Sequence, residues 1–261
     1  MISGVLRQKI TAKQPVFGVI SAFTDPVACE YIGLSGFDFY IMDGEHGPVT
    51  AAHAPNLVRA CENAGITAMA RMRTLDEKLI LQFLDAGVMG VIMPGIRSVA
   101  DARQLISSVK YPPLGHRGLG PVRAADYMMG SMTQLEYITF ANENTLIFLQ
   151  IDDIAALDAL PEILQLPEID GCIIGHRDLA MSMGYLDSPN HVEVRKVVKD
   201  IGRQVLDAGK VLGSVAATAS QAQDLLEQGT TLILTSALGL ILQSSKALLV
   251  ARSAFGSSRK E

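Results

Sequence analysis

Several residues that could do chemistry come directly after short apolar runs of the sequence. They combine carboxylates, an imidazole and a guanidinium: Asp43, Glu45, His46, Arg71, Asp152 and Asp178. Carboxylate oxygens are ligands that hard divalent cations prefer, and such a cation together with an arginine can hold a substrate oxyanion. No lysine ends any of these runs, so we do not expect a Schiff-base mechanism. The set predicts metal-assisted chemistry on a small acid.

Each of these residues also has a purely structural interpretation. His46 could be a solvated loop residue, Asp152 or Asp153 could cap the next helix, and Asp178 could be an acid in a first helical turn. These residues all follow apolar runs, and this shared position favours a functional role over a purely structural one. Asp85 differs, because it lies in the last turn of an expected helix, where the helix dipole disfavours an acid by up to ~1 kcal/mol. That position suggests a cationic partner, such as a protonated histidine.

Eight apolar runs alternate with longer segments of helical period, which is the pattern of βα units. Each run is continuously apolar, as buried parallel strands are. The predicted strands are Val16–Ser21, Phe37–Met42, Thr67–Arg71, Gly90–Met93, Leu146–Ile151, Gly171–Ile174, Val211–Val215 and Thr231–Thr235. Eight strands, each followed by a helix, predict a closed (β/α)8 TIM barrel whose strand ends form the active-site mouth. The alternative is an open doubly wound sheet, which the lack of a glycine-rich turn after the first run disfavours.

The segments between the runs predict the helices, and capping residues mark several of their ends. The predicted helices are Asp25–Leu34, Ala51–Ala64, Glu77–Ala86, Ser98–Val109, Asp153–Leu164, His191–Ala208, Ala219–Gln228 and Ala237–Phe255. Ser98 followed by Asp101 approaches a capping box. The stretch Lys110–Gly130 is rich in proline, glycine and arginine, and we expect a long ordered loop that covers the active site. Residues 1–261 are expected to form one domain.

The composition limits the classes of function. The chain has 261 residues, 49% hydrophobic composition and a net charge of −5, which suits a single barrel domain. No basic stretch favours nucleic acid or an anionic membrane surface, and no apolar run is long enough to span a bilayer. Cys29, Cys61 and Cys172 lack the spacing of a disulfide framework or a metal site. We therefore expect buried free thiols and a cytoplasmic location.

Longer motifs around these residues resemble one known family. The segments SGFDFYIMDGEHGP, YPPLGHRGLG, FLQIDD and DGCIIGHRDLAMSMG resemble the HpcH/HpaI aldolases, and the similarity runs from about Phe17 to Leu249. The resemblance implies a (β/α)8 barrel whose last helix is exchanged with a neighbouring subunit, in a hexamer or trimer of dimers. It also implies a class II pyruvate aldolase, which splits a 4-hydroxy-2-oxo acid reversibly into pyruvate and an aldehyde with Mg²⁺, Mn²⁺ or Co²⁺.

Carried over position by position, the resemblance implies roles for the site residues. His46 matches the base that works through a metal-bound water, Asp85 matches the acid that raises the basicity of that histidine, and Arg71 matches the arginine that stabilises the enolate. The residues expected to contact the substrate are Gln150, Arg177 and Asp178, and those expected to bind the metal are Asp152 and Asp178.

Two departures from the family pattern bear on the substrate and the metal. Asp152 stands where the family has glutamate, and His176 and Arg177 stand where it has Pro-Ala. The alternative function is a metal-independent carbon–carbon ligase of citrate-synthase type, as in siderophore biosynthesis, with Arg71 and Arg177 holding a dicarboxylate. A barrel that only binds a small carboxylate is a third hypothesis, which the joint presence of base, acid and arginine disfavours.

Overall fold

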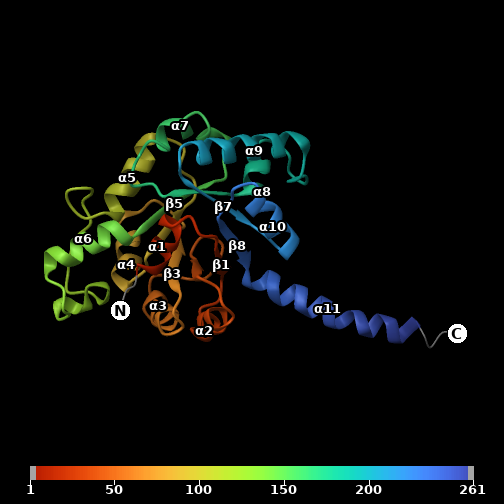
Figure 1. Cartoon of the computed structure of the whole chain (residues 1–261), viewed down its shortest axis with the longest axis horizontal. Coiled ribbons are helices and arrows are strands. Elements are labelled where there is room, and N and C mark those ends of the chain that lie inside the picture. The colour runs from red at the N-terminus through yellow and green to blue at the C-terminus, as the bar shows by residue number, and fades with distance from the viewer. Residues whose placement is uncertain (1–3, 258–261) are drawn as a thin grey trace.

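Eight parallel strands close into a barrel in which each strand pairs with the next along the chain and the last pairs with the first (Figure 1). The computed structural model describes the backbone of residues 4–257 and the side chains of residues 4–250. The strands are β1 (Val16–Ser21), β2 (Phe39–Asp43), β3 (Thr67–Arg71), β4 (Gly90–Met93), β5 (Leu146–Ile151), β6 (Gly171–Ile174), β7 (Val211–Val215) and β8 (Leu232–Ser236). The predicted closed barrel is confirmed, and the alternative of an open sheet is wrong.

Six of the eight strands have the predicted bounds, because a buried parallel strand is a continuous apolar run with polar or glycine residues at its ends. The exceptions are β2 and β8. β2 starts at Phe39 rather than Phe37, and the Asp38 carboxylate just before it accepts the backbone N–H of Phe17 instead. β2 extends to Asp43 and β8 to Ser236. These two strands thus end on polar residues at the carboxyl end of the barrel.

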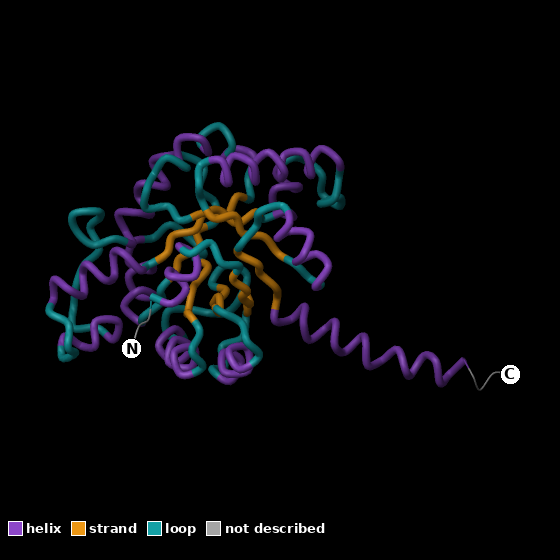
Figure 2. The backbone as a smooth tube through the Cα atoms, viewed as in Figure 1, coloured by secondary structure: helices purple, strands orange, loops and turns teal. Residues whose placement is uncertain are grey.

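Helices surround the barrel (Figure 2). They are α1 (Val5–Thr11), α2 (Val27–Leu34), α3 (Ala54–Asn63), α4 (Glu77–Ala86), α5 (Val99–Val109), α6 (Gln134–Asn144), α7 (Leu160–Ile163), α8 (His176–Ser182), α9 (Val192–Asp207), α10 (Ala219–Glu227) and α11 (Ala237–Ser257), with 3-10 turns η1 (Arg123–Met128) and η2 (Ile154–Ala156). Ser98 and Asp101 form the predicted capping box of α5. Gly87 ends α4 with φ of 104°, a left-handed conformation that glycine adopts without steric cost.

The helices differ from the predictions in several places. The predicted helix Asp153–Leu164 is broken into η2 and α7, because Pro161 has no N–H to donate and its ring would clash with the preceding turn of a continuous helix. The helices α1, α6 and α8 were not predicted. α6 nevertheless carries a capping box of Thr133 and Glu136, and it packs on the rest of the chain through the buried Tyr137.

The apolar core has two layers, one inside the barrel and one between the strands and the helices. Phe39, Met69 and Phe148 belong to the inner layer. Gly18 makes room for Phe39, since a Cβ there would lie 2.0 Å from the Phe39 ring. Leu6 of α1 is buried in the same inner cluster, so α1 closes the N-terminal end of the barrel. The opposite end of the barrel, where the carboxyl ends of the strands lie, is not closed by α1, and barrel enzymes have their active sites at that end.

The last helix, α11, extends away from the barrel (Figures 1 and 2). Its first part contacts β1 and β8, whereas much of its apolar surface is exposed: Leu238, Ile241, Leu242, Leu248, Leu249 and Val250. An exposed apolar surface of this kind marks an interaction site. The exchange of this helix with a neighbour stays a prediction, as does a single domain over residues 1–261, whose two ends lie outside the described residues.

Two expectations from composition can be compared with the structure. Cys29, Cys61 and Cys172 are buried and free, as predicted. A search of the described helices finds none with the length and apolar character to cross a membrane.

Candidate active site

The predicted site residues divide between the two ends of the barrel. Asp43 and Arg71 are the last residues of β2 and β3 and lie opposite each other in register. Gln150 lies in β5 next to its carboxyl end, and Asp152 directly follows that strand. The other residues at this end are His46, in the turn after β2, and Arg177 and Asp178, in the first turn of α8 after β6. Asp85 lies elsewhere, in the last turn of α4.

Asp43 and Arg71 form a bidentate ion pair at the mouth. Arg71 donates from Nε to Asp43 Oδ1 at 3.0 Å and from Nη2 to Oδ2 at 2.7 Å. Asp43 Oδ1 also accepts the backbone N–H groups of Glu45 and His46, each at 3.2 Å. Burial raises the pKa of Asp43, but Arg71 and the two N–H groups outweigh it, and the pKa is lower than usual. Asp43 is therefore a fixed anion that orients Arg71 and shapes the turn carrying His46.

Gln150 connects this ion pair to the predicted metal ligand. Arg71 Nη1 donates to Gln150 Oε1 at 3.2 Å, and Gln150 Nε2 donates to Asp152 Oδ2 at 3.2 Å. Asp43, Arg71, Gln150 and Asp152 thus form one hydrogen-bonded chain across three strands, which we call the mouth network. Gln150 is buried, and each end of its amide has a partner. The amide therefore fixes Arg71 and Asp152 relative to each other.

Glu45 and His46 project from the turn beside the mouth network. Glu45 Oε2 lies 3.2 Å from Arg71 Nη1 and 3.9 Å from His46 Nε2. Burial raises the pKa of Glu45, although the charges of Arg71 and His46 lower it in part. The side chain of His46 is 63% exposed, so its ring is free to turn toward a bound molecule. The sequence placed Glu45 in this group but assigned it no role.

Asp152 and Asp178 provide a donor set that a divalent cation could use. Burial raises the pKa of Asp152, and the negative charge of Asp178 raises it further. Among the described residues, no cationic side chain forms an ion pair with Asp152. Its oxygens accept from the Gln150 amide at 3.2 Å and from the N–H of Gly95 at 3.4 Å. Within the described part of the chain, no three His, Cys, Asp or Glu side chains gather into a complete metal site. Two carboxylates with uncompensated charge therefore fit a cation that completes its coordination with water and substrate.

The cationic partner of Asp85 is an arginine. Arg117 Nη2 donates to Asp85 Oδ1 at 3.2 Å, and the Arg117 side chain is only 2% exposed. Its guanidinium carbon lies 4.5 Å above the ring centre of Tyr111. Burial raises the pKa of Asp85, although Arg117 lowers it in part. No hydrogen bond joins Asp85 to His46 among the described residues, so their pairing stays a prediction. Arg117 was missed, although an acid at a helix C-terminus signals a nearby cation.

The loop Lys110–Gly130 does not cover the mouth of its own barrel, and that expectation is wrong. The loop follows α5 and leads toward β5, so it belongs to the end where helices finish and strands begin. Arg117 binds the last turn of α4, and Arg123 donates to the carbonyl of Ala86 at 2.9 Å and pairs with Glu62. The loop is therefore anchored at the N-terminal end of the barrel.

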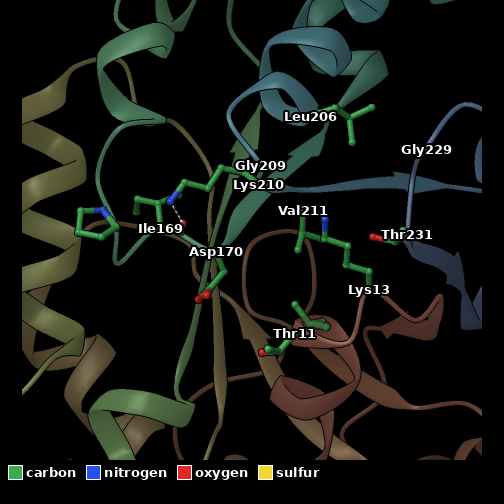
Figure 3. Close-up of a pocket in the computed structure, with 12 residues that line it drawn as sticks. Thr11, Lys13, Ile169, Asp170, Leu206, Gly209, Lys210, Val211, Gly229 and Thr231 are labelled. Atoms are coloured by element: carbon green, nitrogen blue, oxygen red, sulfur yellow. Dashed lines mark hydrogen bonds between the residues drawn. The ribbon is translucent and has the colours of Figure 1, made fainter.

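Two cavities lie at different ends of the molecule. One of about 290 Å³ lies beside Arg71 and is lined also by Gly44, Arg73 and Phe83. Another of about 380 Å³ lies at the N-terminal end, between α1 and the first residues of β7 and β8 (Figure 3). Lys210 lines the second cavity, but its ammonium group donates to two backbone carbonyls at 2.8 and 2.7 Å. We place the chemistry at the first end, because the second cavity contains none of the predicted residues.

An imidazole, a fixed arginine and two carboxylates lie at the carboxyl ends of the strands of a closed (β/α)8 barrel, which is where enzymes of this fold carry their active sites. The family model for HpcH/HpaI aldolase/citrate lyase matches residues 17–241. The chain belongs to this family, and it is a carbon–carbon lyase of the aldolase type.

Named relatives agree with this assignment. The 5-keto-4-deoxy-D-glucarate aldolase of Escherichia coli O6:H1 is 30% identical over 240 residues, which cover 92% of this chain and 93% of that protein. The 2-keto-3-deoxy-L-rhamnonate aldolase of Shigella dysenteriae serotype 1 is 29% identical over 89% of this chain and 86% of that protein. The crystal structure of an HpcH/HpaI aldolase from Desulfitobacterium hafniense DCB-2 is 27% identical, with a TM-score of 0.87 and 95% of both chains covered.

Two further solved structures share the fold at lower identity. Citrate synthase SbnG is 24% identical with a TM-score of 0.86, over 97% of this chain and 98% of that chain. The citrate lyase beta subunit from M. tuberculosis, complexed with oxaloacetate and magnesium, is 15% identical with a TM-score of 0.56, over 87% of this chain and 93% of that chain.

Proposed function

We propose that the protein cleaves a 4-hydroxy-2-oxo acid reversibly to pyruvate and an aldehyde with the help of a divalent metal. The mouth network supports this proposal most directly, because it joins the arginine that faces the developing enolate to a carboxylate suited to a metal. Retro-aldol cleavage needs a base for the hydroxyl proton and an electron sink for the enolate. His46 is the base in this proposal, and Arg71 provides fixed positive charge for the enolate oxygen.

Asp152 and Asp178 are the proposed metal ligands. A bound Mg²⁺, Mn²⁺ or Co²⁺ ion supplies Lewis acidity toward the keto oxygen and carboxylate of the substrate. Asp152 is shorter than the family glutamate by one carbon–carbon bond, about 1.5 Å, whereas Mg²⁺–oxygen distances are held near ~2.0–2.1 Å. Asp152 would therefore hold such an ion with a shorter reach than the family glutamate. Gln150 positions Asp152, and Arg177 and Asp178 face the substrate.

The proposed pairing of His46 with Asp85 requires two subunits. His46 follows β2 at the carboxyl end of the barrel, whereas Asp85 ends a helix that returns the chain to the start of β4. The exposed α11 supports an assembly of this kind, with the helix packed on a neighbour in a hexamer or trimer of dimers.

Buried free thiols fit a reducing compartment, and we infer that the protein acts in the cytoplasm on a small oxo acid.

Pyruvate release from a panel of 4-hydroxy-2-oxo acids tests the proposal. We expect EDTA to abolish activity and added Mg²⁺, Mn²⁺ or Co²⁺ to restore it. If the metal-free protein keeps full activity, the metal-dependent mechanism is wrong.

The second candidate is a metal-independent ligase of citrate-synthase type. Arg177 favours it, because this exposed arginine makes no ion pair with any described residue and could bind a carboxylate bidentately. Activity with oxaloacetate that survives EDTA and is lost in Arg177→Ala would support this candidate.

A further inference from the structure

Glu45 Oε2 is a buried oxygen without a hydrogen-bond partner among the described residues. Arg71 Nη1 lies 3.2 Å from it, close enough for an ion pair but not aligned as a hydrogen bond. A buried acceptor that lacks a hydrogen bond destabilises the folded protein, so this oxygen is free to accept a proton donor that moves beside it. The His46 ring is the other ionisable group beside it, with Nε2 at 3.9 Å.

Asp43 and Glu45 share the Arg71 guanidinium but are held very differently. Asp43 takes both parallel hydrogen bonds of Arg71 and two backbone N–H groups, and its pKa is lower than usual. Glu45 is half-buried and lacks those hydrogen bonds, and the burial raises its pKa. Environments that push the pKa values of two neighbouring acids apart identify an acid–base pair of distinct roles. Hydrogen bonds to both oxygens hold the Asp43 carboxylate in place, whereas the Oε2 atom of Glu45 has no hydrogen bond and faces His46 Nε2.

We propose that Glu45 is a catalytic residue that receives the substrate hydroxyl proton from His46 and delivers it to the enolate carbon. This inference rests on the proposed aldolase function. In the cleavage direction, neutral His46 removes the hydroxyl proton as the carbon–carbon bond breaks and its electron pair forms the enolate. Nε2 takes up this proton, and the resulting imidazolium turns and passes the same proton to ionised Glu45, which leaves the Nδ1–H group for the proposed pairing with Asp85. Protonated Glu45 then gives this proton to the enolate carbon, which becomes the methyl group of pyruvate.

The geometry allows the transfer with small side-chain movements. The distance of 3.9 Å must shorten to about 2.6–3.2 Å for proton transfer. The exposed His46 ring can turn by that amount, while Asp43 holds the backbone of the turn through the N–H groups of residues 45 and 46. Glu45 also lies near enough to Asp152 for the charge of that residue to act on it. The Glu45 carboxylate thus lies close to the proposed base His46, to Arg71, which is proposed to stabilise the enolate, and to the proposed metal ligand Asp152.

The test separates proton transfer to carbon from formation of the enolate. Exchange of the pyruvate methyl protons with D2O, followed by NMR with Mg²⁺, Mn²⁺ or Co²⁺ present, measures the first. Release of CO2 from oxaloacetate measures the second, since decarboxylation forms the same enolate without removal of a proton. We expect Glu45→Gln to lower methyl exchange by about 10²–10⁴-fold and to change CO2 release far less than that. Glu45→Asp, which keeps the acid, should retain part of the exchange.

Glu30→Gln on α2 is the matched control, because it makes the same chemical change at an exposed glutamate, and both rates should equal those of the native protein. If native protein exchanges methyl protons and Glu45→Gln does so equally fast, this inference is wrong while the proposed function stands. If Glu45→Gln loses both reactions, Glu45 acts on enolate formation and the proton-transfer role is also wrong. A native protein that shows no exchange with any of the three metals overturns the proposed function itself.

Discussion

Replacing Asp43 with asparagine tests whether the ion pair with Arg71 organises the mouth of the barrel. Asparagine keeps the size of the side chain but removes its charge, and its amide can accept only one of the two guanidinium N–H groups. Loss of one partner from a buried ion pair typically costs about 3–5 kcal/mol. We expect a loss of about 2–3 kcal/mol in the free energy of unfolding, because Glu45 lies 3.2 Å from the same guanidinium and replaces part of the charge.

The effect of Asp43→Asn should depend on pH in one direction. The folded-state pKa of Asp43 is lowered, because Arg71 and the backbone N–H groups outweigh the opposing effect of burial. The stabilisation is then fully present above the unfolded-state pKa of about 3.9, and it is lost as the pH falls through the folded-state pKa. The difference in unfolding free energy between native protein and variant should be constant near neutral pH and shrink below about pH 4.

Urea unfolding followed by circular dichroism measures this difference across the pH range in which the native protein is folded. Asp200→Asn is the matched control, since Asp200 pairs with Arg203 on an exposed helix surface and its side chain is 51% exposed. Exposed pairs contribute about 0–1 kcal/mol. If Asp43→Asn is no more destabilising than Asp200→Asn, or if its effect grows toward acid pH, the reasoning about the mouth network is refuted.

Four further outcomes are expected. His46→Ala should lower the rate of pyruvate release by about 10²–10⁴-fold, and a variant with native turnover would show that His46 is not the base. Asp85→Asn should slow the reaction and lower the apparent pKa of the basic group in the pH–rate profile; no change in either would rule out the pairing with His46. Burial lowers the pKa of Lys110 to about 8, so the unfolded chain binds more protons above this pH, and native stability in urea should rise between about pH 8 and 10. Lys110→Met should lack that rise, and equal slopes for the two proteins would contradict the assignment. Sedimentation at micromolar concentration should show an oligomer that depends on α11, and a monomer there would contradict the packing of this helix on a neighbour.

The strands and most helix ends could be predicted because their signals are local. A buried parallel strand is apolar on both faces, so its run of residues is visible without knowledge of its neighbours. Ser98 and Asp101 form their capping box through residues three positions apart. The helix α1 was not predicted because it has no apolar face of helical period: Leu6 alone is buried, in the cluster inside the barrel. The apolar pattern of the predicted helix Asp153–Leu164 continues through Pro161, but the proline divides this segment into η2 and α7.

The sequence alone determined which residue types stand at or just after the carboxyl ends of the strands, and so it made His46, Arg71 and Asp152 candidates. Only the tertiary structure decided their partners. Arg71 meets Gln150 across 79 positions of the chain, and Asp85 meets Arg117 across 32. Strand register and the packing of segments far apart in the chain select these contacts, and the spacing of residues along the sequence does not specify them. The order of predicted elements already places the loop Lys110–Gly130 at the N-terminal end, after a helix and before a strand, whereas only the packed structure shows one oxygen of Glu45 without a hydrogen bond beside the imidazole.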